Sequence, residues 1–384
     1  MVCYSGYNND FEVLKKSSSG GIFYELAVKV IEAHGMVFGA GFNKDGTVSL
    51  KGVENLEELD NLLGSKYVQA HPENVYSQVK SKLKNKVLFC GTPCQCNALM
   101  QYLNGTHPEN LLIVDFVCHG IPSERVWKEY LDYLNADMDS CSISFRDKRD
   151  GWKNYGISIK RKGEKEYFCH HGKDSFFRLF ISDLILRPSC YFCKSKGERR
   201  SSDITIGDFW SKSDEITNSR GCSLIVTHSE IGEAAVEEIS NKIALTRISS
   251  DKAFEANKSY YTACTLPYRR KRIFDMLEED TKKIFEKAEK LAEIPLAERA
   301  MCKVQRKIEN KLEMKDKHSY LEMKCPSTVN EKSVCCGCGA CANACPTGAI
   351  KMTLDTEGFI YPSVDNSKCC SCGKCKKVCF SYQR

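Results

Sequence analysis

Long apolar runs are absent from this chain, and apolar segments such as Leu111–Val114 are far too short to span a bilayer. The first residues also lack the apolar stretch that is typical of a secretory signal. We therefore expect a cytoplasmic protein without a membrane span. Apolar residues make up 42% of the 384 positions and charged residues 28%, a composition that excludes wholesale disorder and provides for two or three domains.

Several function classes lack their sequence signatures. The formal net charge is +6, but Lys and Arg alternate with Asp and Glu and form no basic–aromatic stripe, so we expect no nucleic-acid partner. No G-x-G-x-x-G motif is present, which excludes a Rossmann dinucleotide site. No Ser/His/Asp or Cys/His nucleophile pattern stands out, so we predict no catalytic side chain.

Cysteine, in contrast, is abundant, with 23 residues. Thiols in a reducing cytosol do not persist as disulfides, so a cysteine-rich chain without a signal segment favours metal or cluster ligation.

Composition divides the chain into three regions. Residues 1–275 alternate short apolar runs with glycine-rich turns, which predicts an α/β domain with a mixed sheet. Its expected elements include a helix opened by Lys16–Gly21 and strands at Met36–Phe42, Val87–Cys90 and Leu111–Val117. A cysteine-bearing turn follows each of the last two strands. If these strands are parallel, both turns lie at the sheet edge where open α/β sheets bind ligands.

The second region, residues 276–330, is dense in Lys, Glu, Leu and Ala and predicts a helical linker. Apolar residues recur there at steps of three and four, which is typical of an amphipathic helix. They are Ala297, Met301, Val304, Ile308 and Leu312.

The third region, residues 331–384, contains an internal repeat and predicts a small α+β domain. A C-x2-C-x2-C-x3-C run recurs after 34 residues, since Cys335 aligns with Cys369. This doubled run is typical of a bacterial two-cluster ferredoxin, in which the fourth cysteine of each run serves the other cluster. A pair of zinc sites is the alternative, but zinc ribbons do not use this doubled form. We expect two [4Fe-4S] clusters, one held by Cys335, Cys338, Cys341 and Cys379 and the other by Cys369, Cys372, Cys375 and Cys345.

Four cysteines of the first region are candidates for a third cluster. Cys94 and Cys118 follow strand ends, whereas Cys190 and Cys193 form a C-x2-C pair. Spacing alone leaves a redox dithiol or half a zinc site open for that pair.

A family resemblance adds to this interpretation. The segments KSSSGG, GSKYVQA, FCGTPCQ, VCHGIPS, FRDK with GW, RPSCYFC and SDITIGDFW occur in this order. Together they resemble the coenzyme F420 hydrogenase/dehydrogenase beta-subunit family over nearly all of residues 4–275. The resemblance implies FAD and one [4Fe-4S] cluster held by Cys94, Cys118, Cys190 and Cys193. In many members the flavin exchanges a hydride with coenzyme F420.

A flavin dinucleotide also brings a pyrophosphate, which a serine- and glycine-rich loop at a helix start can bind through backbone N–H groups. An ordinary helix N-cap is the alternative for that loop, a solvated surface lysine the alternative for Lys66, and a core tryptophan the alternative for Trp210. The expected FAD-binding residues are Ser17, Ser18, Ser19, Gly20, Gly21, Gly64, Ser65, Lys66, Tyr67, Thr92, Asp208 and Trp210.

These expectations describe an iron–sulfur flavoprotein oxidoreductase with three clusters and FAD. Its expected partners are a redox protein (a ferredoxin or a partner subunit) and a small-molecule hydride donor or acceptor, for which coenzyme F420 is a candidate. Two alternatives stay open: a ferredoxin-dependent reductase of an organic substrate unrelated to F420, and a non-catalytic electron-transfer subunit of a larger complex.

Overall fold

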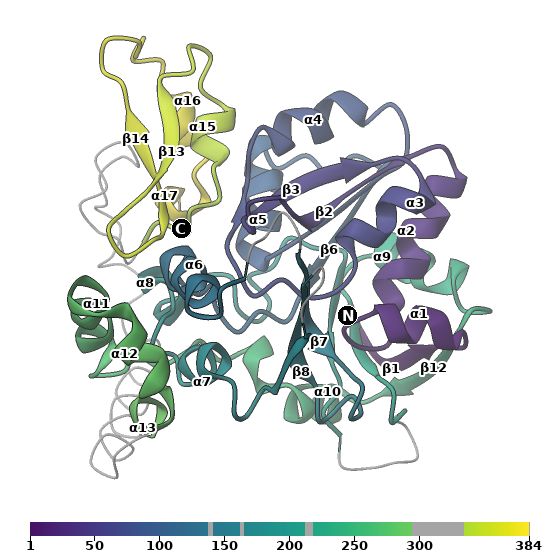
Figure 1. Ribbon diagram of the computed structural model, residues 1–384. Coiled ribbons are helices and arrows are strands. Elements are labelled where there is room, and N and C mark those ends of the chain that lie inside the picture. The colour runs from purple at the N-terminus through teal and green to yellow at the C-terminus, as the bar shows by residue number, and fades with distance from the viewer. Residues whose placement is uncertain (137–140, 162–164, 212–217, 294–333, 384) are drawn as a thin grey trace.

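The computed structural model describes residues 1–136, 141–161, 165–211, 218–293 and 334–383. Its largest element is a nine-stranded sheet with the order β12-β1-β11-β10-β6-β5-β2-β3-β4 (Figure 1). The central strands β2, β5, β6 and β10 are parallel to one another, and antiparallel strands flank them. The sheet is therefore mixed, as expected. Its strands are β1 (Val2–Asn8), β2 (Met36–Phe42), β3 (Val48–Val53), β4 (Ala70–His71), β5 (Val87–Gly91), β6 (Leu111–Phe116), β10 (Ile204–Asp208), β11 (Ser223–Thr227) and β12 (Ile243–Ile248).

The central strands are buried on both faces, which explains their continuous apolar runs. Val37 and Leu88 point to one face and Phe38 and Phe89 to the other, because successive side chains of a strand alternate. The first face packs against α2 (Ile22–Glu32), α3 (Leu56–Leu59) and α9 (Glu230–Glu238). The second packs against α4 (Val75–Lys82) and α5 (Pro93–Tyr102). The remaining short elements are α1 (Phe11–Lys16), η1 (Asp60–Leu62), α8 (Pro188–Tyr191), α10 (Ser250–Ala256) and η4 (Lys258–Tyr260).

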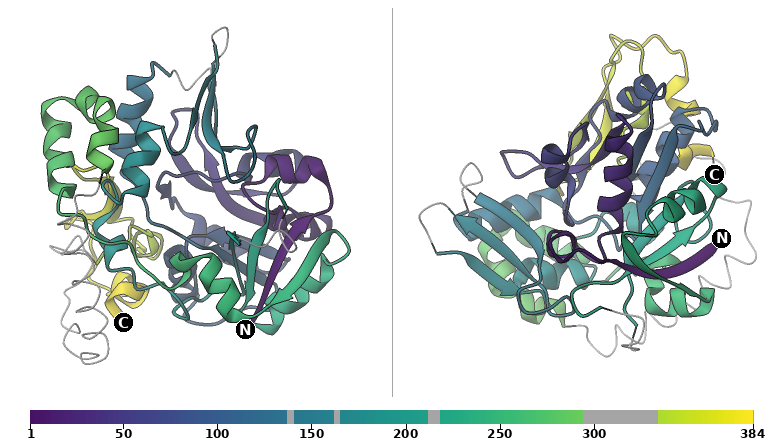
Figure 2. Two further views of the ribbon diagram at one scale, coloured as in Figure 1. Left: turned by 90° about the horizontal axis from the view of Figure 1, so that it is seen from below. Right: turned by 90° about the vertical axis from the view of Figure 1, so that its right-hand side faces the viewer.

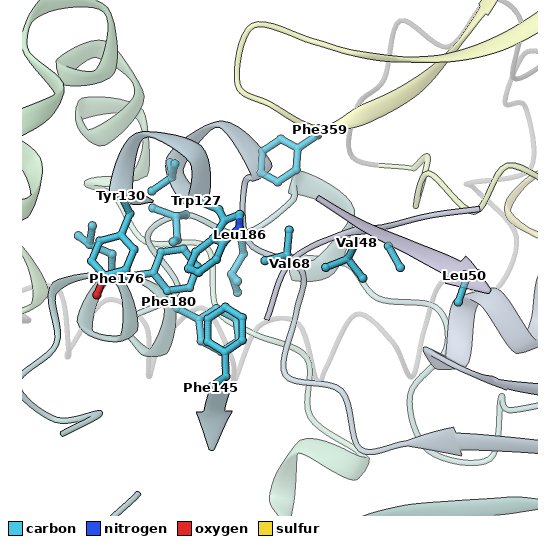
Figure 3. Close-up of a cluster of buried hydrophobic side chains, with 14 of the residues drawn as sticks. Val48, Leu50, Val68, Trp127, Tyr130, Phe145, Phe176, Phe180, Leu186 and Phe359 are labelled. Carbon is cyan, nitrogen blue, oxygen red and sulfur yellow. The ribbon is translucent and has the colours of Figure 1, made fainter. Parts of the chain in front are cut away.

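A second layer is built around aromatic side chains. It contains a three-stranded antiparallel sheet and five helices, and its core includes Trp127, Tyr130, Phe145 and Phe176 (Figure 3). Ring centroids of Trp127 and Phe145 are 4.9 Å apart. The elements are β7 (Cys141–Asp147), β8 (Gly156–Arg161), β9 (Tyr167–His170), α6 (Glu124–Tyr133), α7 (Ser175–Ile181), α11 (Arg270–Glu279), α12 (Thr281–Glu286) and α13 (Ala288–Ala292).

The expected helical linker is described only in its first part, which contains α12, α13 and part of α11. The amphipathic helix expected around Ala297–Leu312 lies outside the described residues. Within the described part of the chain, no helix has both the length and the apolar character needed to cross a membrane.

The C-terminal module, residues 334–383, repeats its backbone geometry as well as its cysteines. Gly339 (φ 75°) and Gly373 (φ 70°) both adopt the left-handed conformation, and each starts a one-turn helix. The module consists of α15 (Ala340–Asn343), β13 (Ile350–Leu354), β14 (Ile360–Val364), α16 (Lys374–Lys377) and α17 (Phe380–Gln383).

This module packs directly on the large domain. Its buried residues Ala340, Phe359, Val378 and Phe380 belong to the same hydrophobic cluster as the second layer. The views from below and from the side also show the module against the domain (Figure 2). Polar contacts add to the interface, including a bidentate ion pair of Arg270 and Glu357 with its shorter contact at 2.7 Å.

Candidate functional site

A cavity of about 490 Å³ opens at the carboxyl ends of β5, β6 and β10, the sheet edge where open α/β sheets bind ligands. Its volume lies within the range of small-molecule and cofactor sites. The cysteine-bearing turns after β5 and β6 both line it, as the parallel arrangement of these strands predicts. The expected FAD-binding residues on its wall are Ser17, Ser18, Ser19, Gly21, Gly64, Ser65, Lys66, Tyr67, Thr92, Asp208 and Trp210.

Gly20 is the expected residue that the structure does not bring to the cavity wall. A Cβ at this position would lie 2.4 Å from the backbone oxygen of Gly6 and 2.7 Å from the backbone nitrogen of Ser223. Its own N–H donates to the Ser223 hydroxyl at 2.9 Å. Gly20 therefore allows the loop to pack closely against β1 and β11.

The serines of this loop do not cap the following helix. Gly21 is the N-cap of α2, and no side chain hydrogen-bonds there. The Ser19 hydroxyl instead donates to the backbone oxygen of Cys222 at 2.7 Å, and the hydroxyls of Ser18 and Ser65 are 2.8 Å apart. These side chains therefore do not act as N-caps of α2. They belong to a polar loop on the cavity wall.

Lys66 is half-buried on the same wall. Its ammonium Nζ donates to the backbone oxygens of Leu63 at 2.7 Å and Asn61 at 3.1 Å. Burial lowers the pKa of Lys66 to about 7, against the opposing effect of Cys90. A lysine with this pKa gains charge readily when an anion binds beside it.

Asp208 is held by a residue that sequence reasoning missed as a site residue. Arg146 is buried and donates to Asp208 at 2.9 and 3.1 Å and to the Tyr67 hydroxyl at 3.3 Å. Its Nε atom is buried without a hydrogen-bond partner among the described residues, and Arg146 lines the cavity. Arg146 belongs to the FRDK segment, and its place in that motif was the available signal.

Trp210 is at the cavity mouth and is not a core residue. Its side chain is 36% exposed and stacks on Trp152 with ring centroids 4.6 Å apart. Trp152 in turn donates from its ring nitrogen to Asp208 at 3.2 Å. An exposed indole in this position offers a flat apolar face to a planar ring.

The four candidate cysteines of the large domain gather beside the cavity. Burial and the neighbouring thiols of Cys118, Cys193 and Cys94 raise the pKa of Cys190. The backbone N–H of Ile121 donates to Cys190 Sγ at 3.4 Å. Segments far apart in sequence therefore bring four thiols to one place.

Polar groups surround these thiols. Burial raises the pKa of Cys118 to about 12, whereas the nearby cations Lys196 and Arg200 lower it. The hydroxyl of Thr92 lies 3.1 Å from Cys94 Sγ. Such donors and cations stabilise the negative charge that thiolate ligands carry.

In the C-terminal module, the structure brings together the first expected ligand set. Burial and the neighbouring thiols of Cys335, Cys379 and Cys375 raise the pKa of Cys341. Cys338 also lies close to Cys379 and Cys341. Of the second expected set, Cys369 and Cys372 are exposed, while Cys345 and Cys375 are half-buried.

Cys336 connects the two cysteine groups, a role that spacing could not indicate. Its thiol lies close to Cys94 of the large domain and to Cys338 of the module. Cys336 also lines the cavity, as do Cys94 and Cys118. The cavity wall therefore borders both cysteine groups.

The residues present thus fit both kinds of cofactor. The cavity has hydroxyls and a low-pKa lysine for an anionic dinucleotide. The cysteine groups have the thiol donor chemistry of iron–sulfur clusters.

Comparison with known proteins supports the resemblance seen in the sequence. Residues 84–251 match the family model that describes the C terminus of the beta subunit of coenzyme F420 hydrogenase/dehydrogenase. Residues 334–381 match the model of the 4Fe-4S dicluster domain. The chain therefore contains a domain of the first family, which comprises subunits of redox enzymes, followed by a dicluster domain with two clusters.

None of the curated proteins matches this chain. A solved structure described as "Xenon derivatization of the F420-reducing [NiFe] hydrogenase complex from Methanosarcina barkeri" shares 16% sequence identity. The match covers 76% of this chain and 90% of that chain, with a TM-score of 0.48.

Proposed function

We propose that this protein is an iron–sulfur flavoprotein oxidoreductase that transfers electrons between ferredoxin-type clusters and a small-molecule hydride donor or acceptor. Coenzyme F420 is the first candidate for that molecule, given the matched family. One observation carries the proposal: Cys94, Cys118 and Cys336 line the same cavity as the Ser17–Ser19 loop and Lys66. Candidate cluster ligands and flavin-binding groups thus share one wall.

The cysteine neighbours outline an electron route through the chain. The cluster expected at Cys369, Cys372, Cys375 and Cys345 is called the outer cluster, and the one expected at Cys335, Cys338, Cys341 and Cys379 the inner cluster. Cys375 of the outer cluster lies beside Cys341 of the inner cluster. Cys336 then links the inner cluster to Cys94 of the large-domain cluster. Each step of the route joins neighbouring thiols, so three clusters would form a chain that ends at the cavity.

The cavity residues would bind FAD by charge and shape. The Ser17–Ser19 loop and Lys66 would hold the pyrophosphate, while Asp208, braced by Arg146, and Trp210 would border the ring system. FAD, when bound, supplies both one-electron and two-electron (hydride) chemistry. The side chains themselves position the cofactor and exclude water. None of them needs to act as a nucleophile.

The outer end of the route suits an acidic redox partner. Cys369 and Cys372 are exposed, and the exposed lysines Lys374, Lys376 and Lys377 lie on the adjacent helix α16. Complementary charge steers the association of redox proteins and sets its salt dependence. A ferredoxin or a partner subunit with an acidic face would meet this surface.

Anaerobic purification followed by iron, sulfide and flavin analysis tests the proposal. We expect one FAD and about twelve irons per chain, from three clusters of four. The holoprotein is then mixed separately with reduced F420, NADH and reduced ferredoxin. Flavin bleaching by reduced F420 supports the proposal. Absence of flavin contradicts it.

The same measurements distinguish the alternatives. A ferredoxin-dependent reductase of another organic substrate would be reduced by ferredoxin but by neither hydride donor. A non-catalytic subunit would exchange electrons with ferredoxin and show no turnover with any small molecule.

A further inference from the structure

Three side chains at the cavity wall form a cluster that the proposed function does not use. They are His119 in the turn after β6, Asp183 after α7 and Cys264 after η4, all half-buried. Their ligand atoms all lie within 4.8 Å of one another, the only such group among the residues that the structure describes.

The contact between His119 and Asp183 is short but is not a hydrogen bond. His119 Nε2 lies 2.8 Å from Asp183 Oδ1, yet neither atom has a hydrogen-bond partner within the described part of the chain. Two other histidine–carboxylate pairs do form hydrogen bonds, His71 with Glu124 at 2.6 Å and His107 with Asp203 at 3.0 Å. In the His119 pair, the two atoms face each other at the distance of an ion pair but without the directional geometry of a hydrogen bond. Among the described residues neither atom has a hydrogen-bond partner, so both can ligate a cation.

The surrounding structure fixes each of the three groups. The backbone N–H of Thr265 donates to the other oxygen of Asp183 at 3.3 Å, which leaves Oδ1 to face His119. The His119 ring packs edge-on against Phe180, with centroids 5.1 Å apart. The Cys264 thiol donates to the backbone oxygen of His119 at 2.7 Å. The Thr265 and Phe180 contacts hold the carboxylate and the imidazole ring in place, as groups around metal ligands do. The Cys264 thiol gives up its bond to the His119 oxygen when it loses its proton to bind a metal.

We propose that His119, Asp183 and Cys264 bind one divalent transition-metal ion, with Zn²⁺ the best match. Imidazole nitrogen, carboxylate oxygen and thiolate sulfur are the three ligand types of zinc sites, and three protein ligands leave the fourth position to water. Calcium and magnesium prefer sites made of oxygen atoms, and so are not favoured here.

The charge balance is simple. Zn²⁺ displaces the proton of the Cys264 thiol, the thiolate forms the Zn–S bond, and one proton passes to the buffer for each ion bound. The thiolate and the Asp183 carboxylate then neutralise the two positive charges, while His119 binds as the neutral imidazole. Because His119 also lines the cavity, the ion would hold that part of the wall to segments 64 and 145 residues further along the chain.

Metal analysis of the holoprotein tests this site. The wild type, Cys264→Ser and the control Cys169→Ser are equilibrated anaerobically with Zn²⁺, passed through a desalting column and analysed for zinc and iron. Cys169 is a matched control, because it is also half-buried and its thiol also donates to a backbone oxygen. We expect one zinc per chain in the wild type and the control. Cys264→Ser should bind zinc at least tenfold more weakly and keep all its iron.

Three results would overturn the proposal: no bound zinc in the wild type, zinc retained in full by Cys264→Ser, or loss of four irons in that variant. The last would make Cys264 a cluster ligand. If Cys264→Ser does not fold, Asp183→Asn takes its place, since an amide oxygen can still accept from Thr265. The probe is then Co²⁺ measured by electron paramagnetic resonance in the oxidised protein, whose [4Fe-4S]²⁺ clusters are diamagnetic. A wild-type cobalt signal that is unchanged in Asp183→Asn contradicts the proposed site.

Discussion

The guanidinium of Arg187 donates from Nε to the backbone oxygen of Cys335 at 2.9 Å, and so joins the large domain to the C-terminal module. Arg187 is fully buried, and its other nitrogens donate to Ile360 O at 2.8 Å and to Gln69 at 3.1 Å. One side chain thus bonds to acceptors in both parts of the chain. It also places a positive charge beside Cys335, Cys336 and Cys190, three cysteines of the proposed electron route.

Arg187→Met should lower both stability and reduction potential. Removal of the donors leaves buried oxygens unpaired, which costs at least about 3 kcal/mol of unfolding free energy. Loss of the positive charge makes the reduced clusters less favourable, so their potentials fall. Denaturant unfolding and a redox titration measure the two effects. Arg149→Met, at an exposed Arg paired with Asp147 and Glu166, is the control and should change neither.

Ser18→Asp should abolish flavin binding and leave the clusters intact. A carboxylate on this wall would repel the pyrophosphate, and no candidate cluster ligand lies in the loop. FAD and iron are measured on the same anaerobic sample. Ser81→Asp, at an exposed serine of α4, controls for the added charge. Stoichiometric FAD in Ser18→Asp would place the pyrophosphate elsewhere in the cavity. Gly20 is unsuitable for this test because substitution there would disturb the packing of β1.

FAD affinity should fall as the pH rises above about 7. Burial lowers the pKa of Lys66 to about 7, so the free protein loses the ammonium charge through that region. The charged form binds a phosphate more tightly, so the dissociation constant rises with pH until the pKa of the complex is passed. Fluorescence titration of FAD between pH 6 and 9 measures the trend. The profile of Lys66→Met should be flat. A wild-type profile equally flat would mean that Lys66 does not meet the anion.

The same pKa shift affects the stability of the protein without FAD. A lysine whose pKa is lower in the folded state binds fewer protons there than in the unfolded state between pH 7 and its ordinary value of 10.5. Stability from this group therefore increases with pH across that interval.

Cysteine variants should separate ligands from spare thiols. Cys193→Ser is expected to lose about four irons, the content of one cubane. Cys96→Ser should lose none, since Cys96 is fully buried in the hydrophobic core. Cys336→Ser should also keep its iron but slow electron transfer between module and cavity, because Cys336 contacts Cys94. Iron analysis and stopped-flow reduction by ferredoxin measure these outcomes. An unchanged iron content in Cys193→Ser would exclude it as a ligand.

Local features of this protein could be predicted from the sequence. The strand Met36–Phe42 was predicted with the bounds of β2, and the strands that became β5 and β6 to within one residue. The dicluster module followed from cysteine spacing alone. These features depend on residues close in sequence, whose periodicity and ligand spacing are visible without a fold.

Contacts between distant segments were decided only by the tertiary structure. The pairing of Arg146 with Asp208, the link from Cys336 to Cys94 and the packing of Gly20 against β1 join segments that have no common local pattern. The cluster of His119, Asp183 and Cys264 has the same origin. The type of each residue determines which ligands it can bind. The tertiary packing of helices and loops on the sheet determines which of these side chains come into contact, because each such contact depends on the packing of the whole domain.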